Sequence, residues 1–580
     1  DAAYSRAYQY IRGDFNMSSG LFEITNNHLR FMTTCVDNIS GGTIRVGGNF
    51  HAPYAGAFQP TGGEVEMIGS TGSEIQCYNG NYLHDLVIEN DTWLMQDLVI
   101  NNDLSINSGY FNLNGHTTDV VDRVYIYDNL RMVNASDVLN CDYIEWNSGS
   151  SDTVTTGTIN VGSDWYFNDG TTAQLGTGNT VTFTNYGNYI YCYDADAEFG
   201  TVEIPDSGFP EYAFLMGGST EPMRVSGDMT VSNGNTFHLQ NEELIVDGTL
   251  DINSGGIMDI GSNGELELDS DFDLNGELDV GSGDVLAHGK FEIATTGNLT
   301  IDGGSFVNDV AWSQDIQILR GTFSLSSGLF EVTYTNVSIA SSFIDNISGG
   351  TFRFGGTFSA TSPDTFQPTG GEVEAEGGFY CRNGNYFYDL RSNGGSPFTD
   401  ITINNDLYIE SGPFVINNTI DVENDVHIYS GVHMNSSTDI LEVGNDITWY
   451  SGSFGGIHDE ISDGTINVSG DWYFNAGTNA QLEAGSTVNF VGTENSNIYC
   501  ADDNACFGTL VIDKDSANNR VYIYDGDTVR IAGDLDISSG SLNLWDLCVL
   551  EIGSALNIYN LGELDTDANS DAPIITQYGI

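Results

Sequence analysis

The stretch Leu250-Asp-Ile-Asn-Ser-Gly-Gly-Ile-Met-Asp-Ile-Gly-Ser-Asn-Gly-Glu-Leu-Glu-Leu268 decides the fold class of this chain. Apolar and polar residues alternate over a few positions, and then Gly, Asn, Asp or Ser interrupts the alternation. Alternation with a period of two places one face of a strand in a core and the other in water. The turns follow one another too closely to leave room for helices. The stretch therefore predicts short strands joined by tight turns.

The same alternation continues as far as Leu299, and two architectures fit it. In a parallel β-solenoid, each strand pairs with its equivalent one turn away, so that like residues stack in ladders. In an antiparallel meander of β-sandwich type, Asn263-Gly264 and Asn275-Gly276 would form tight hairpins. We favour the solenoid, because stacked turns produce strand sequences that recur at fixed intervals. The predicted fold is thus all-β with almost no helix.

The chain is a tandem duplication. Ser18-Ser-Gly-Leu-Phe-Glu23 returns as Ser326–Glu331, and Phe58-Gln-Pro-Thr-Gly-Gly-Glu-Val-Glu66 returns unchanged at Phe366–Glu374, in both cases 308 residues later (326 − 18 and 366 − 58). Self-similarity at a fixed spacing is typical of repeat architectures. We therefore predict a first half at 1–308 and a second half at 309–580. Each half divides again into two modules, at about 18–140 and 141–308, and at about 326–447 and 448–580.

Two recurring sequence motifs resemble those of known families. Gly-Thr-Ile-Asn-Val occurs at Gly157–Val161 and Gly464–Val468, each time just before Asp-Trp, and Leu-x-Ile-x-Ser-Gly-x-Leu-x-Leu occurs at Leu535–Leu544. This text resembles that of large secreted β-repeat proteins of bacteria and archaea. The size, acidity, duplication and cysteine usage are similar to those of the major proteins of the tubular sheaths that encase filamentous methanogenic archaea. The resemblance implies a β-helical fold and a surface location, and for the sheath family an amyloid-like, disulfide-strengthened assembly.

The net charge limits the possible partners. Lys and Arg number 15 against 82 Asp and Glu, which gives −67 at pH 7. Nucleic acids and anionic lipid surfaces would be repelled, because binding them requires clustered Lys or Arg. No run of 18 apolar residues occurs, so we predict no membrane insertion. A surface this acidic either takes up Ca²⁺ or other divalent cations or remains a solvated coat, and the composition leaves both readings open.

The repeats also indicate candidate cation ligands and disulfides. Asp194 and Asp196 stand in the first half where Asp502 and Asp503 stand in the second, in turns beside a cysteine. Carboxylates in such turns either bind Ca²⁺ or are simply solvated. Cysteines in a secreted chain favour disulfides, within the chain or between subunits, and buried thiols are the alternative. The candidates are Cys35, Cys77, Cys141, Cys192, Cys381, Cys500, Cys506 and Cys548.

The usual catalytic motifs are missing from the sequence. Neither Gly-x-Ser-x-Gly nor His-Glu-x-x-His occurs, and the nine His are dispersed. We therefore predict that the chain is not an enzyme and needs no organic cofactor. Trp165-Tyr-Phe167 and Trp472-Tyr-Phe474 must each present at least one ring outward. Such a ring either binds sugars or packs against a neighbouring turn or subunit.

These inferences combine into one functional expectation. The chain starts at Asp1, which we interpret as the end left by removal of a secretory signal. We expect an extracellular or cell-surface protein that assembles with copies of itself into a fibre, sheath or surface layer. Pairing of strand edges would drive assembly, with cations and disulfides as candidate reinforcement. The alternative function is a cell-surface adhesin or a glycan-binding β-helix module.

Overall fold

The computed structural model describes residues 7–577 except for 71, 79, 186, 207–211, 217, 311–315, 451–460, 479, 525 and 567–571. This described part holds 62 strands and no helix. The strands form a parallel β-solenoid of about 25 turns, as the sequence predicts. Two compact units make up the chain: unit 1 is 1–291 with 296–300, and unit 2 is 292–295 with 301–580. The boundary predicted from the duplication, at residue 308, lies inside unit 2.

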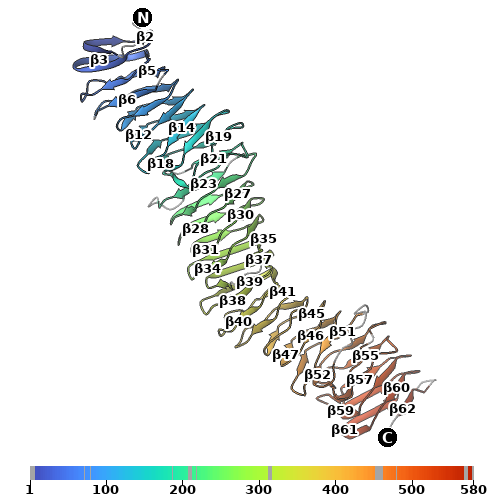
Figure 1. Cartoon of the computed structure of the whole chain (residues 1–580). Helices are drawn as coiled ribbons and strands as arrows, with labels where there is room; N and C mark the ends of the chain where they lie inside the picture. Colours follow the sequence, from blue (N-terminus) through green and yellow to red (C-terminus); the bar gives the residue numbers. More distant parts are fainter. Residues whose placement is uncertain are drawn as a thin grey trace. The chain divides into compact units, whose positions relative to one another are not determined.

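Each regular turn supplies three strands, which pair with the strands of the next turn and not with one another. In unit 1 one such turn consists of β12 (Thr117–Val120), β13 (Arg123–Ile126) and β14 (Asn129–Met132). All three pair in parallel with strands about 20 residues later, and within each unit the strands of successive turns lie side by side (Figure 1). The partner strands are β15 (Val138–Cys141), β16 (Tyr143–Trp146) and β17 (Ser151–Val154).

The register stacks apolar side chains in columns inside the solenoid. Val124 lies opposite Leu104 of the preceding turn and opposite Ile144 of the following one, and all three are fully buried. Complete burial of such a side chain contributes roughly 1.5–3 kcal/mol, so the columns stabilise the stacking of turns beside the backbone hydrogen bonds. The column in unit 1 comprises Leu86, Leu104, Val124, Ile144, Trp165 and Ile190, and its counterpart in unit 2 comprises Leu390, Leu407, Val426, Ile447, Trp472 and Ile498.

The antiparallel alternative is wrong, and its two Asn-Gly pairs show why. β29 (Ile257–Asp259) and β30 (Glu265–Leu268) flank Asn263-Gly264, yet each pairs only with strands of other turns. A Cβ on Gly264 would lie 2.1 Å from the carbonyl oxygen of Ile260, and a Cβ on Gly276 would lie 2.4 Å from that of Asn253. These glycines permit a tight corner and close contact between turns. They do not reverse the chain.

Aspartates at one corner join successive turns of unit 2. Asp406 Oδ1 accepts hydrogen bonds from the side-chain amide of Asn424 at 2.6 Å and from the backbone N–H of Asp425 at 3.1 Å. Asp425 repeats both contacts one turn later, with Asn445 and Asp446. The Asn-Asp dipeptide that recurs in the sequence thus forms a hydrogen-bonded corner in each of these turns. Desolvation raises the pKa of Asp446, and the hydrogen bond from the backbone N–H of Asp471 offsets part of this effect, while the charges of Asp471 and Asp425 add to it.

Candidate functional site

The first strands of the described chain present an open edge. β1 (Tyr8–Met17) and β2 (Leu21–Ile24) both pair with β3 (His28–Val46), and no described strand pairs with their opposite edge. Leu21 on β2 is 55% exposed. An unpaired edge offers a row of backbone N–H and C=O groups to another strand. On β1 and β2, exposed apolar side chains lie beside these unpaired backbone groups.

A second open edge lies on the last strands. β61 (Leu556–Thr566) pairs with β59 (Leu535–Leu544), and β62 (Ile574–Gln577) pairs with β60 (Val549–Ile552). In the described ranges nothing pairs with the far side of β61 or β62. Leu561 is 64% exposed, and Ile558, Tyr559 and Ile574 are exposed beside it. This edge therefore also carries exposed apolar side chains.

The duplicated sequence shows how the first edge looks when a turn covers it. β37 (Thr322–Val332) contains Ser326–Glu331, the second copy of Ser18–Glu23, and pairs with β39 (Ile344–Phe354) as β2 pairs with β3. Its other side is covered by residues 302–306 of β35 (Asn298–Asn308).

The contacts across this covered edge are specific. The rings of Phe306 and Phe330 stack with centroids 5.4 Å apart, and Asp302 accepts hydrogen bonds from the hydroxyls of Ser326 at 2.6 Å and Ser327 at 3.2 Å. Phe330 is fully buried, whereas its counterpart Phe22 is only half-buried. A strand with this sequence can therefore be covered by the strand of a preceding turn.

The predicted cation ligands of the first half brace a turn. One carboxylate oxygen of Asp194 accepts the N–H of Gly170 from the preceding turn at 2.7 Å, and the other accepts the N–H of Asp196 at 2.9 Å. Asp196 itself is exposed. Both oxygens of Asp194 thus have backbone donors.

The equivalent pair in the second half is placed alike. Asp502 is buried, with Oδ1 accepting the N–H of Asn504 at 2.8 Å and Oδ2 accepting the hydroxyl of Thr478 at 3.3 Å. Asp503 is exposed next to it. Neither pair belongs to a group of three ligands among the described residues. Cation binding at these four aspartates stays a prediction.

A different group has the spacing of metal ligands. Glu267 and Asp269, on and just after β30, bring carboxylate oxygens to within 4.8 Å of each other and of an imidazole nitrogen of His288. The Nε2 atom of His288 lies 3.5 Å from Glu267 Oε1. These residues could hold a divalent cation at the surface of unit 1. Spacing along the chain does not indicate this group, because His288 comes from the turn after the one that carries the two acids.

The candidate cysteines lie apart from one another inside the solenoid. Cys77 stacks on Ala52 and Cys381 on Ala360, whereas Cys192 stacks on Phe167 and Cys500 on Phe474. Seven of the eight are buried, and Cys506 is half-buried. Burial raises the pKa of Cys77 to about 12, as it does for Cys192 and Cys500. Buried, protonated thiols of this kind behave as small apolar side chains.

The aromatic triplets point as the alternation predicts, with one ring outward. Trp165 and Phe167 are buried, and the outward ring of Tyr166 stacks on Tyr191 of the next turn at 4.3 Å. In unit 2 the ring of Tyr473 stacks on Tyr499 at 4.7 Å in the same manner. Both outward rings therefore pack against a neighbouring turn.

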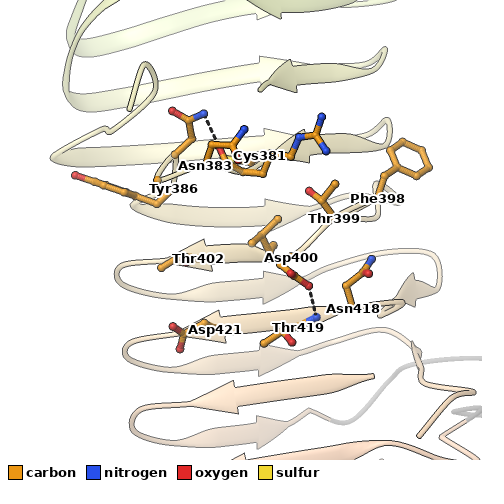
Figure 2. A pocket seen from close by; sticks show the side chains of 14 residues that line it. Cys381, Asn383, Tyr386, Phe398, Thr399, Asp400, Thr402, Asn418, Thr419 and Asp421 are labelled. Carbon is orange, nitrogen blue, oxygen red and sulfur yellow. Dashed lines mark hydrogen bonds between the residues drawn. The ribbon is translucent and has the colours of Figure 1, made fainter. Parts of the chain in front are cut away.

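One groove in unit 2 was not predicted from the sequence. It has a volume of about 710 Å³ and lies between the turn that follows β42 (Phe379–Cys381) and the starts of β44 (Ile401–Ile403) and β47 (Thr419–Val422) (Figure 2). Asp400, Thr402, Asn418 and Asp421 stand along its lower part in the view, with Phe398 and Thr399 above them. No repeat-level motif marks it, because it arises where the second half departs from the first.

Known proteins provide no further assignment. Comparisons with protein-family models, with curated proteins and with solved structures find no match to this chain. Within the described ranges, no helix has the length and apolar character that crossing a membrane would require.

Proposed function

We propose that this chain is a structural protein that assembles with copies of itself end to end into a fibre, sheath or surface layer, at the cell surface or outside the cell. The observation that carries the proposal is that β1 and β2, and likewise β61 and β62, carry exposed apolar side chains along an edge that no described strand pairs. Each edge offers unpaired backbone groups for parallel pairing. No Pro lies on any of these four strands, and Pro is a usual means of blocking such an edge.

The duplication suggests how one copy would follow another. Within unit 2, residues of β35 cover the Ser-Ser-Gly-Leu-Phe-Glu strand of the second half through Phe306 and Asp302. In end-to-end assembly, β61 and β62 of one copy would cover the matching strand of the next copy. Such a contact is heterologous, and repetition of a heterologous contact produces an open filament unless its rotation closes a ring. If the chains do not assemble, they should instead appear as separate β-solenoids of uniform length.

Charge determines the conditions under which assembly should occur. Chains of net charge −67 repel each other, and this repulsion is screened within about 10 Å at 0.1 M salt. Divalent cations between carboxylates of neighbouring copies would strengthen the contact further. Disulfides contribute less to this picture, since seven of the eight thiols are buried within the solenoid.

The test uses one substitution at each edge. Leu21→Lys and Leu561→Lys place a charge on a residue that is already exposed, so each should leave the fold intact and prevent polymer growth from that edge. Val121→Lys is the matched control, because Val121 is 62% exposed between β12 and β13, far along the chain from both edges. Negative-stain electron microscopy and sedimentation would measure polymer length.

Mixing the two edge variants makes the test sharper. Leu21→Lys retains a functional last edge and Leu561→Lys retains a functional first edge, so an equimolar mixture should stop at heterodimers. The wild type and Val121→Lys should form long polymers under the same conditions. Wild-type chains that remain single particles at high concentration and salt would refute the proposal, and so would edge variants that polymerise normally.

A further inference from the structure

The groove in unit 2 exists because a strand ladder stops there. In the first half, β6 (Ser73–Cys77) pairs with β8 (Thr92–Leu94) over three residues. At the equivalent place in the second half, β42 makes a single bridge, from Phe379 to Pro397. Pro397 has no N–H to continue the ladder, so the chain leaves the sheet. The space below β42 therefore stays open as the groove of Figure 2.

The ring of Phe398 lines this groove, and the ring of Tyr380 packs against it. Tyr380 and Phe398 lie with ring centroids 4.7 Å apart and planes 30° from each other, and Phe398 is 50% exposed. The Phe398 ring also rests directly on the backbone of Gly378, where an added Cβ would lie 2.2 Å from a ring carbon. Backbone and Tyr380 thus hold the ring in place while part of it faces water. A fixed, exposed ring of this kind is a stacking platform.

Polar groups of several kinds line the rest of the groove. Asp400 Oδ1 accepts the N–H of Thr419 at 2.9 Å, and this contact holds the carboxylate at the groove (Figure 2). The hydroxyl of Thr399 is buried, and no described atom hydrogen-bonds to it. Arg382, Asn418 and Asp421 also line the groove. Planar guanidinium, amide and carboxylate groups each present two polar atoms side by side, a spacing that suits adjacent hydroxyls.

We propose that this groove binds a neutral glycan, with a sugar ring stacked on Phe398 and its hydroxyls bonded to the polar lining. The combination of an apolar ring face with adjacent hydroxyls is the chemistry that this lining matches. A volume of about 710 Å³ lies within the roughly 300–1,000 Å³ of small-molecule sites. Two carboxylates against one guanidinium, on a chain of charge −67, disfavour an acidic polysaccharide. The groove includes no residue of β1, β2, β61 or β62, so the proposal does not depend on assembly.

The experiment measures binding of defined oligosaccharides to the full chain by isothermal titration calorimetry. Cellohexaose, chitohexaose and mannohexaose serve as neutral probes, and a hyaluronan hexamer serves as the anionic one. We expect at least one neutral probe to bind and the hyaluronan hexamer not to bind. Phe398→Ala should weaken the neutral binding at least about tenfold, and Thr399→Val, which keeps the volume of the side chain, should weaken it about threefold.

The first half of the chain supplies the control. Tyr78 occupies the position of Arg382 in a turn where the ladder continues, so Tyr78→Ala should leave glycan affinity unchanged. An unaltered thermal melting curve for Thr399→Val would show that its loss of affinity is local. The proposal is refuted if none of the neutral probes binds at millimolar concentration, if hyaluronan binds as tightly as they do, or if both groove variants retain wild-type affinity.

Discussion

Gly20 and Gly328 occupy equivalent positions in two copies of one sequence, but within the described residues only Gly328 is covered by another turn. Their φ angles are +90° and +89°. A Cβ on Gly328 would lie 2.1 Å from the carbonyl oxygen of Gly304, whereas no described atom lies within 4 Å of a Cβ on Gly20. The two glycines thus differ in their neighbours and not in their backbone.

Substitutions at these two glycines distinguish effects on the stability of a single chain from effects on assembly. Alanine at either position meets the same backbone strain, of roughly 1–3 kcal/mol, because φ is positive. Gly328→Ala adds a clash with Gly304, so its thermal unfolding midpoint should fall further than that of Gly20→Ala. Gly20→Ala should block polymer growth, since the last strands of the preceding copy would meet the new methyl group. Equal midpoints together with normal polymers would contradict both the packing at Gly328 and the proposed contact at Gly20.

The cations should act on assembly through screening. If divalent ions only reduce repulsion, EDTA at low ionic strength should shorten the polymers, and 0.5 M NaCl should restore them, because the screening length is then only a few ångströms. Turbidity and electron microscopy would follow both steps. A polymer that NaCl does not restore would instead indicate specific cation sites. Asp194→Asn and Asp502→Asn would then test the predicted turns directly.

The thiols should be almost inert in the folded chain. Burial raises the pKa of Cys35 to about 11, with Asp37 and Asp14 adding to the effect, so little thiolate exists at neutral pH. A thiol reagent such as DTNB should react first with the half-buried Cys506, and with the rest only after unfolding. Cys506→Ser should remove the fast reaction, and reductant should leave polymers intact. Rapid reaction of several thiols, or polymers that dissolve in reductant, would contradict this expectation.

The sequence was sufficient to predict the fold because the determining signals repeat. Alternation over Leu250–Leu268 fixes which side chains point inward, and the 308-residue duplication favours stacking of equivalent turns. The Asn-Gly pairs were ambiguous, because the same dipeptide suits a hairpin and a tight corner. The difference lies in what approaches the glycine: at Gly264 it is the carbonyl oxygen of Ile260, which only the folded chain reveals.

The sites were harder to predict, because they depend on residues that are distant in sequence. Glu267 meets His288 only through the stacking of turns. The groove at Phe398 forms where Pro397 interrupts a strand ladder that continues in the first half. The outward direction of Tyr166 was predictable from alternation, whereas its stacking on Tyr191 required the register.

Asp152 should make unit 1 more stable as the pH falls from 8 to 5. Burial raises the pKa of this carboxyl to about 7, although the backbone N–H groups of Val154 and Gln174 offset part of the effect. Its Oδ2 atom is buried, and no described group bonds to it. Because the folded-state pKa exceeds the unfolded one near 3.9, the folded state binds the extra proton between about pH 4 and 7. The contribution is therefore greatest at low pH and is lost as the pH rises through 7.

The variant Asp152→Asn imitates the protonated form at every pH. It should be more stable than the wild type at pH 8, by about 2–4 kcal/mol, and the difference should vanish toward pH 4. Urea unfolding at a series of pH values measures this difference directly. Asp302→Asn is the opposite control: hydrogen bonds from Ser326 and Ser327 lower the pKa of Asp302, so its substitution should reduce stability at neutral pH. A pH-independent difference for Asp152→Asn would mean that its carboxyl is not desolvated in the folded chain.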